Sequence, residues 1–235
     1  MKIAVLHPGE MGAAVAMALG EHVIWDPEGR SAATAERARN LTPGNPLEAD
    51  VILSICPPHA ARDVARSVRA FTGIYVDANA VSPATSREIR GIVAGAHFVD
   101  GGIIGPPPTA PGSTRLYLSG DRAQDVAALF ADTILDARVV SDAGALKMAY
   151  AAWTKGSAAL IIAAHRLAEA LGVEAELDDE WRDATLTERH AAALRAAEEK
   201  GWRWVGEMEE IADTFAAAGQ PDGFHRAAAQ VFRQS

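Results

Sequence analysis

The chain has 235 residues, of which 49% are hydrophobic and 23% charged. This composition is typical of a globular protein with a substantial core, and it excludes an intrinsically disordered chain. The formal charge is −9 and both halves of the chain are acidic, so we expect no nucleic-acid partner. A single cysteine, Cys56, excludes an internal disulfide framework and zinc sites built from several thiolates.

No targeting or membrane-spanning segment is expected. The apolar run at residues 3–6 is too short for the core of a signal peptide. The longest apolar stretch, at residues 158–164, falls well short of the roughly 20 residues that a bilayer requires. We therefore expect a cytoplasmic protein with no membrane partner.

The first 140 residues alternate between strand-like and helix-like segments. Ser31 is a plausible N-cap of a short helix that reaches Asn40, and Val64, Val68 and Phe71 have the spacing of a buried helical face. Unbroken apolar strands separated by helices predict a parallel sheet that is covered on both faces. The predicted strands occupy residues 2–6, 22–25, 51–55, 74–76, 97–99 and 115–118.

Residues 101–112 are rich in glycine and proline, which predicts an irregular loop. After residue 140 the strand-like segments end. Residues 146–171 predict one long helix with Gly172 just beyond its end, and the remainder is helical with interruptions at Gly201, Gly206 and residues 219–223. We expect a doubly wound α/β domain at residues 1–140 and a small all-α domain at residues 141–235.

A glycine turn joins the first predicted strand to the first helix. It reads His7-Pro8-Gly9-Glu10-Met11-Gly12 and matches the last two glycines of the dinucleotide fingerprint G-x-G-x-x-G, with His7 in place of the first. Gly9 would let a pyrophosphate approach the backbone, and Gly12 would let the helix pack closely on the strand. The helix N-terminus would then attract the phosphates. The alternative is a tight turn that binds no ligand.

The second predicted strand ends at an acid, Asp26. A carboxylate at this position of a Rossmann-type fold holds the adenosine ribose hydroxyls, which favours NAD. Arg30, Ser31 and Thr34 follow directly and would suit a 2′-phosphate. We therefore expect NADP, with NAD as the alternative; a solvated surface charge is the other interpretation of Arg30.

Several segments together resemble the β-hydroxyacid dehydrogenase and 6-phosphogluconate dehydrogenase superfamily. Residues 6–12 are similar to its glycine turn, and the run from Lys147 to Gly156 is similar to the start of the interdomain helix that carries its catalytic lysine. The C-terminal part resembles a subgroup whose compact helical domain has no assigned role. The other segments that carry the resemblance are residues 49–53, 76–83, 99–105, 202–210 and 221–225.

The resemblance implies a role for several residues. Lys147 would be the general acid/base; the alternative is a lysine at a helix start that packs its stem and extends its charge to solvent. Gly101-Gly102-Ile103-Ile104 would be the substrate loop, with Ile104 in place of the family's serine. The family's asparagine is replaced by Ala151. The histidine and the acidic residue of phosphogluconate enzymes are replaced by Tyr150 and Thr154, and these losses argue against phosphogluconate oxidation.

Other candidates have a structural alternative. Tyr150 and Thr154 share a helical face with Lys147, although Tyr150 would also suit a core position. Asn79 would bind the nicotinamide ribose or the substrate, or else serve as a turn residue after a strand. Cys56 ends a strand near the expected nicotinamide, and we expect it to be a small buried hydrophobic residue. Trp204 would close over the substrate or else pack in a core or dimer interface.

These observations predict an NAD(P)-dependent oxidoreductase that transfers a hydride between nicotinamide and a small hydroxy acid or keto compound. An imine or ketimine reductase and a non-catalytic NAD(P)-binding sensor are the alternatives. We expect no metal, and a homodimer formed through the C-terminal helices. The predicted site residues are Lys147, Tyr150 and Thr154 for catalysis; His7, Pro8, Gly9, Glu10, Met11, Gly12, Asp26, Arg30, Ser31, Cys56, Pro57 and Asn79 for the cofactor; and Gly101, Gly102, Ile103, Ile104 and Trp204 for the substrate.

Overall fold

A computed structural model describes residues 1–182 and 185–234. The chain divides into two compact units between Lys147 and Met148. The sequence places the boundary after residue 140, whereas the first turn of the long helix belongs with the first unit. Each unit is described by itself.

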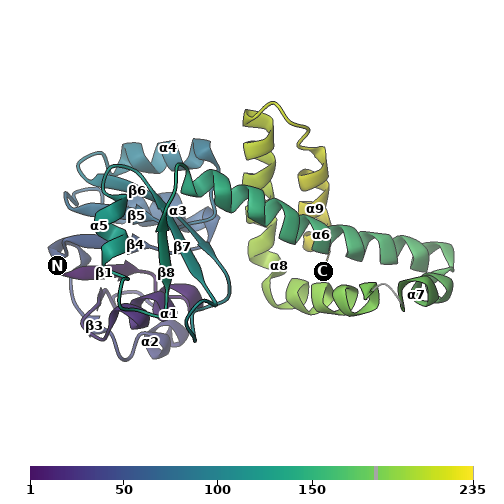
Figure 1. The fold of residues 1–235 in the computed structure, drawn as a ribbon, viewed down its shortest axis with the longest axis horizontal. Coiled ribbons are helices and arrows are strands. Elements are labelled where there is room, and N and C mark those ends of the chain that lie inside the picture. Colours follow the sequence, from purple (N-terminus) through teal and green to yellow (C-terminus); the bar gives the residue numbers. More distant parts are fainter. Residues whose placement is uncertain (183–184, 235) are drawn as a thin grey trace. The chain divides into compact units, whose positions relative to one another are not determined.

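The first unit contains one sheet of eight strands in the order β3-β2-β1-β4-β5-β6-β7-β8 (Figure 1). Strands β1 to β6 are parallel, β7 is antiparallel to β6, and β8 is parallel to β7. The strands are β1 Ile3–Leu6, β2 Ile24–Trp25, β3 Thr42–Pro43, β4 Val51–Ser54, β5 Ile74–Asp77, β6 His97–Ile104, β7 Arg115–Ser119 and β8 Asp136–Val139. This arrangement confirms the predicted doubly wound α/β fold.

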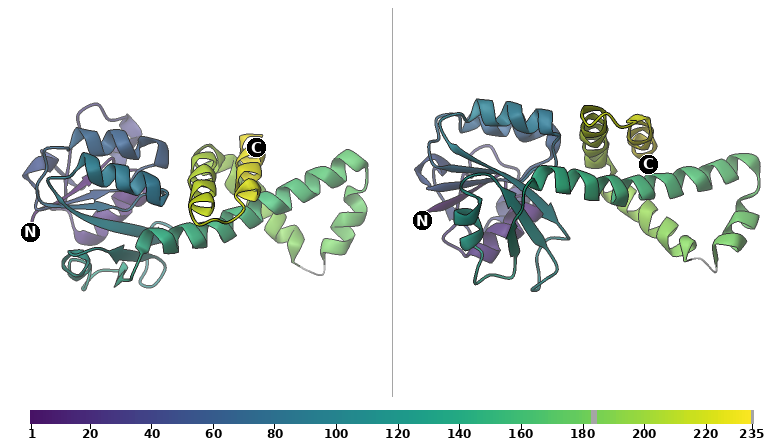
Figure 2. Two further views of the ribbon diagram at one scale, coloured as in Figure 1. Left: turned by 90° about the horizontal axis from the view of Figure 1, so that it is seen from above. Right: turned by 45° about the horizontal axis from the view of Figure 1, so that its top comes forward.

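The two faces of the sheet have separate hydrophobic cores, because neighbouring side chains of a strand point to opposite faces. Ile3 and Val5 of β1 belong to one core, and Ala4 and Leu6 belong to the other. Helices α1 and α5 cover the first face, and α3 and α4 cover the second (Figure 2). The helices of this unit are α1 Glu10–Leu19, α2 Ala32–Arg37, the 3₁₀ turn η1 Pro46–Glu48, α3 Pro58–Ser67, α4 Pro83–Ile92 and α5 Ala123–Ala128.

The second unit is helical. Helix α6 starts in the first unit and continues through the second, where Arg166 donates a hydrogen bond to the carbonyl oxygen of Val231. Helices α8 and α9 pack along each other around buried side chains that include Met208, Ile211 and Phe232. The helices are α6 Ala143–Leu171, α7 Glu174–Arg182, α8 Leu186–Ala217 and α9 Gly223–Arg233. The predicted all-α C-terminal part is confirmed.

Some local predictions are wrong. The segment Gly101–Ile104 is not a loop but the buried end of β6. Gly201 and Gly206 do not interrupt a helix, since both lie inside α8. A Cβ at Gly201 would lie 3.5 Å from the carbonyl oxygen of Phe232, so this glycine stands where α9 approaches α8. The helix expected to reach Asn40 stops at Arg37, although Ser31 caps it as predicted, accepting from the N–H of Thr34.

None of the helices in the described residues combines the length and the hydrophobicity of a membrane span. Across residues 1–182 and 185–234, no cluster of histidine, cysteine or acidic side chains is arranged to hold a metal ion.

Candidate functional site

The strand order reverses between β1 and β4. From β1 the chain runs outward to β2 and β3 on one side, and it then returns to place β4 on the other side of β1. In open α/β sheets, ligands bind at the carboxyl ends of the strands at such a reversal. The loops that follow β1, β2, β4 and β5 all meet at this edge, and they contain most of the predicted cofactor residues.

The turn after β1 leaves room beside the N-terminus of α1. Gly9 is the N-cap of α1 and has no side chain with which to cap the helix, so N–H groups of the first turn are left for other acceptors. A Cβ at Gly9 would meet nothing nearer than the carbonyl oxygen of His7, 4.0 Å away. Pro8 is buried, Met11 is half-buried and Glu10 is exposed. This edge can therefore accept an anion in contact with the backbone.

Gly12 is less constrained than the fingerprint predicts. A Cβ at Gly12 would lie 3.5 Å from the carbonyl oxygen of His7 and 3.6 Å from the side chain of Ile55, which are ordinary van der Waals contacts. The predicted steric need for glycine at this position is therefore wrong, although Gly12 is buried in the turn as expected.

His7, Asp26 and Arg30 form a contact group at the ends of β1 and β2. Nη1 of Arg30 lies 2.8 Å from Nε2 and 3.0 Å from Nδ1 of His7. Nε of Arg30 donates to the carbonyl oxygen of Asp26 at 3.2 Å, and Nη2 lies 3.9 Å from its carboxylate. The Asp26 carboxylate also accepts the N–H of Glu28 at 2.9 Å. His7 and Arg30 are separate candidates in the sequence, and the structure places them in one site.

Asn79 has a structural role between β4 and β5. Its Oδ1 accepts the N–H of Cys56 at 2.6 Å, and its Nδ2 donates to the side chains of Ser54 and Asp77. Asn79 is buried, and these bonds support the turn-residue interpretation over direct contact with a ribose. Burial, with a smaller effect of Asp77, raises the pKa of the Cys56 thiol to about 12, so this cysteine is not a nucleophile. Pro57 is the N-cap of α3.

Lys147 lies in the part of α6 that packs on β6. Its Nζ donates to the carbonyl oxygen of Ile103 at 2.6 Å. A Cβ on Gly102 would lie 2.8 Å from the carbonyl oxygen of Ala143 and 2.9 Å from Cβ of Lys147. Gly102 is therefore the residue that lets α6 approach the sheet, and the predicted substrate segment supports the lysine. Ile103 and Ile104 are buried.

Three side chains fasten the first turn of α6. Ser119 Oγ accepts the N–H of Ala143 at 3.0 Å, Asp100 Oδ2 accepts that of Gly144 at 3.1 Å, and Asp142 Oδ1 accepts that of Ala145 at 2.7 Å. These bonds satisfy N–H groups that a helix start leaves without partners.

Asp100 is a residue that the sequence interpretation missed. Burial, followed by the nearby charge of Asp142, raises its pKa to about 6, while the N–H groups of Gly144 and Gly101 and the charge of Arg90 act in the opposite direction. The sequence feature that could have identified Asp100 is an acidic residue within an otherwise largely apolar strand.

The remaining predicted residues lie on α6 and α8 beyond Lys147. Tyr150 is 47% exposed, so the alternative that it packs in a core is wrong. The Thr154 hydroxyl donates back to the carbonyl oxygens of Tyr150 and Ala151. Trp204 packs edge-on against Phe232, with ring centroids 5.1 Å apart, and its ring lies 6.0 Å from Nζ of Lys155. The structure therefore gives Trp204 a packing role within the second unit.

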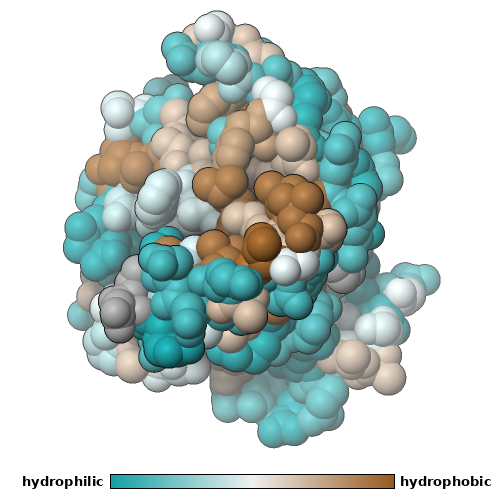
Figure 3. Space-filling view, turned by 90° about the vertical axis from the view of Figure 1, so that its right-hand side faces the viewer, coloured by the Kyte–Doolittle hydropathy of each residue, from teal (hydrophilic) through white to brown (hydrophobic). Residues whose placement is uncertain are grey.

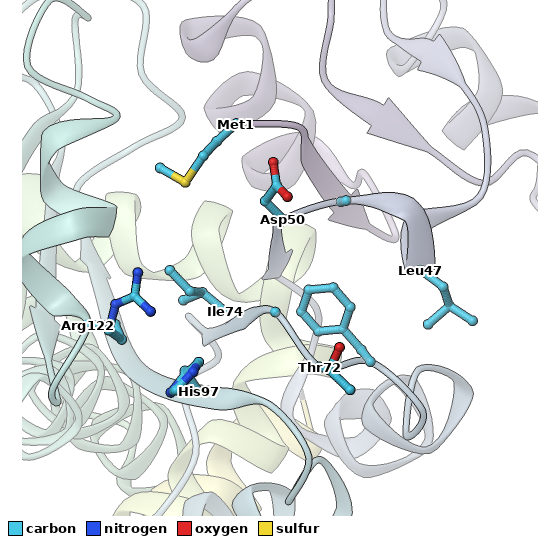
Figure 4. Close-up of a pocket in the computed structure, with 10 residues that line it drawn as sticks. Met1, Leu47, Asp50, Thr72, Ile74, His97 and Arg122 are labelled. Carbon is cyan, nitrogen blue, oxygen red and sulfur yellow. The ribbon is translucent and has the colours of Figure 1, made fainter.

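Two hollows lie away from this edge. One, of about 470 Å³, is at the amino ends of the strands and is lined by Asp50, His97 and Arg122 among others (Figure 4). That is the edge opposite the reversal of strand order, where ligands of this fold class do not normally bind. The other, of about 720 Å³, is a mainly apolar groove of the second unit, between α6 and α8.

Sequence comparisons match parts of the chain to proteins without an assigned role. Residues 168–235 match a family described as a domain of unknown function (DUF1932). The chain is 33% identical over 132 residues to an uncharacterized 28.5 kDa protein from Methanothermus fervidus. That match covers 54% of this chain and 51% of the relative, so the chain spans about half the length of the curated relative it matches.

Solved structures share the fold. The conserved protein MTH1747, whose function is unknown and which is described as similar to 3-hydroxyacid dehydrogenases, has a TM-score of 0.71 at 26% identity, over 100% of this chain and 96% of that one. A 3-hydroxyisobutyrate dehydrogenase of Mycobacterium tuberculosis has a TM-score of 0.65 at 20% identity, over 99% and 92%. A reductive aminase of Aspergillus terreus in complex with NADPH has 0.58 at 17%, over 99% and 92%. These findings confirm the predicted resemblance to 3-hydroxyacid dehydrogenase-like proteins with a C-terminal helical domain.

The raised pKa of Asp100 predicts a pH-dependent stability. The folded chain holds a proton on Asp100 up to about pH 6, whereas an unfolded aspartate releases it near pH 4, so the free energy of unfolding falls as the pH rises between these values. Asp100→Asn should remove this fall, which amounts to at most about 3 kcal/mol. Urea unfolding from pH 4 to pH 7 measures it. The exposed Asp121→Asn is the control and should keep the wild-type slope; an unchanged slope in Asp100→Asn would contradict the assignment.

The close approach at Gly102 predicts opposite effects of two glycine-to-alanine changes. Gly102→Ala places a Cβ against the backbone of α6 and should lower the free energy of unfolding by about 1–3 kcal/mol. Gly91→Ala, on α4 with no atom within 4 Å of the new Cβ, should raise it by about 0.5–1 kcal/mol. Denaturant titration of both variants measures the difference. Equal effects of the two substitutions would argue against the predicted clash.

Proposed function

We propose that the chain is an NAD(P)-dependent oxidoreductase whose dinucleotide binds at the reversal of strand order, with its pyrophosphate at the N-terminus of α1. The observation that carries the proposal is the open, uncapped helix start at Gly9, directly after β1. The structural neighbours support a nicotinamide cofactor, since they include dehydrogenases and a reductase in complex with NADPH.

Within this proposal we favour NADP over NAD. Arg30 stands at the end of β2, where the adenosine ribose of a dinucleotide lies in this fold class. Two of the five N–H groups of its guanidinium donate to His7 and to the carbonyl oxygen of Asp26, which leaves others for a phosphate. The Asp26 carboxylate is partly neutralised by Arg30 and by the N–H of Glu28, which weakens its repulsion of a 2′-phosphate.

Lys147 would serve as the general acid and base. The bound dinucleotide supplies or accepts the hydride, and the reaction also needs a proton at the reacting oxygen or nitrogen. The Lys147 ammonium can donate that proton and take it back in the reverse direction. Its hydrogen bond to Ile103 and the three capped N–H groups of α6 hold the side chain in place, which fixes the point of proton transfer.

The substrate class is a small hydroxy acid or keto compound in the main proposal, with an imine or ketimine as the second. Ile104 stands where the resembling dehydrogenases have a serine, and its apolar side chain offers no hydrogen bond to a carboxylate. That replacement, together with the reductive aminase among the structural neighbours, is the reason to keep the C=N substrate as the second candidate. A cofactor-binding sensor without turnover is the third candidate.

We further propose a homodimer formed through the helical unit. Trp153, Leu160 and Leu167 follow one another at intervals of seven on α6, so they share one face of the helix, and each is at least 57% exposed. Trp153 and Leu160 also line the apolar groove. With the exposed Leu171 the three residues form a stripe that monomeric proteins rarely leave in water. Hydrophobic side chains also gather in the middle of the surface in Figure 3. A second copy presents the same stripe, which suits a symmetric interface.

Replacing Lys147 by Met tests the catalytic proposal. Turnover of NADPH with keto acids or cyclic imines should fall by roughly 10²–10⁴-fold, while the dissociation constant of NADPH changes little. Lys200→Met, on α8, is the matched control and should keep wild-type turnover. If Lys147→Met retains full activity, the lysine is not the acid/base; if wild-type protein binds NADPH without turning over either substrate class, the sensor is favoured.

The dimer is tested by sedimentation at micromolar concentration. Wild-type protein should sediment as a dimer, and Leu160→Glu combined with Leu167→Glu should produce a folded monomer, because two charges cannot be buried in an apolar interface. Leu47→Glu, an exposed leucine of the first unit, is the control and should leave the dimer intact. A wild-type monomer would refute the proposal.

A further inference from the structure

His7 has a backbone conformation that is uncommon for a residue other than glycine. Its φ is 54°, and among the described residues only Thr185 is another non-glycine with a positive φ. An L-residue is strained in this region, which is why the fingerprint has glycine at this position. Where a strained residue persists at a site, its side chain is a candidate for a functional role.

The imidazole of His7 contacts Arg30. Nη1 of Arg30 lies 2.8 Å from Nε2 and 3.0 Å from Nδ1 of the ring, and Arg30 can only donate, so a neutral ring, which has one acceptor nitrogen, suits this contact. Burial, followed by the charge of Arg30, lowers the pKa of His7, and the charge of Asp26 opposes this in part. A neutral ring is thus the form present at pH 7, and it is the form that can hold the guanidinium.

The Arg30 guanidinium makes two contacts, one with His7 and one with Asp26. The Nε of Arg30 donates to the carbonyl oxygen of Asp26, and Nη1 donates to the His7 ring. As a result the long arginine side chain is only 19% exposed, although it arises from a surface loop. A glycine at position 7 would relieve the backbone strain but would remove one of the two contacts that fix the guanidinium.

We propose that His7 is a positioning residue that holds the Arg30 guanidinium at the adenosine end of the dinucleotide site, and thereby sets the preference for a dinucleotide with a phosphate on that ribose. The inference rests on the proposed function. It adds that the replacement of the fingerprint's first glycine by His7 determines which dinucleotide this chain prefers. An arginine already ordered before binding loses less side-chain freedom when it meets the phosphate.

Dissociation constants of NADPH and NADH test the proposal, measured at one salt concentration for wild type, His7→Gly and His7→Asn. Wild type should bind NADPH more tightly than NADH. His7→Gly should weaken NADPH binding by about tenfold with NADH unchanged, since one charge-assisted contact is lost. Asn adopts positive φ readily and its amide oxygen can accept from Arg30, so His7→Asn should retain most of the preference.

Arg30→Met and the double variant complete the experiment. If His7 acts through Arg30, the double variant should have the same ratio of NADPH to NADH affinity as Arg30→Met alone. The losses of preference caused by the two substitutions should therefore not add. Thermal unfolding without ligand gives the second readout: His7→Gly should be at least as stable as wild type because the backbone strain is removed.

Three outcomes with the variants would overturn the inference: a His7→Gly variant with the wild-type ratio of NADPH to NADH affinity, one that binds both dinucleotides more weakly by the same factor, or additive losses in the double variant. A wild-type protein that binds the two dinucleotides equally well would overturn this inference and the preference for NADP, but not the proposed dinucleotide site. One that binds neither would remove the proposed function and this inference with it.

Discussion

The geometry at the end of β1 determines what the first unit can bind. The chain leaves the sheet through a short turn and enters α1 at a residue without a side chain, so no side chain caps the N–H groups of the first helical turn. The reversal of strand order places this helix start at the carboxyl edge of the sheet, beside the ends of β2 and β4. By contrast, the start of α4 is satisfied by the hydroxyl of Ser82.

A second constraint operates at the start of α6. Gly102 lets the helix approach β6 more closely than any other residue would, and Ser119, Asp100 and Asp142 satisfy its first N–H groups. The result is a lysine held on a rigid helix against a rigid strand. In this arrangement the residues assigned to the substrate by resemblance support the lysine, and the buried Asp100 connects the sheet to the helix that bears it.

Much of the fold could be predicted from the sequence because it depends on local patterns. Continuous apolar strands predict the parallel sheet, and Ser31 can be recognised as an N-cap from the sequence. Contacts between distant segments could not be predicted in this way. The segment 101–104 looks like a loop because its glycines are common in turns. In the structure Gly102 lets a helix more than 40 residues later pack closely, and Gly101 lies against Ala78 beyond the end of β5. The contact between His7 and Arg30 likewise joins two strand ends, and only the pairing of β1 with β2 brings it about.

The most direct test of the account is the binding of NADPH to wild type and to Gly9→Val, measured by calorimetry. The backbone at Gly9 has φ of −69°, which valine adopts, so the variant should fold; its side chain would occupy the space beside the helix start and should abolish binding. The same substitution at Gly91, on the surface of α4, should leave binding intact. Equal affinity of wild type and Gly9→Val would contradict the account, because the pyrophosphate would then bind elsewhere.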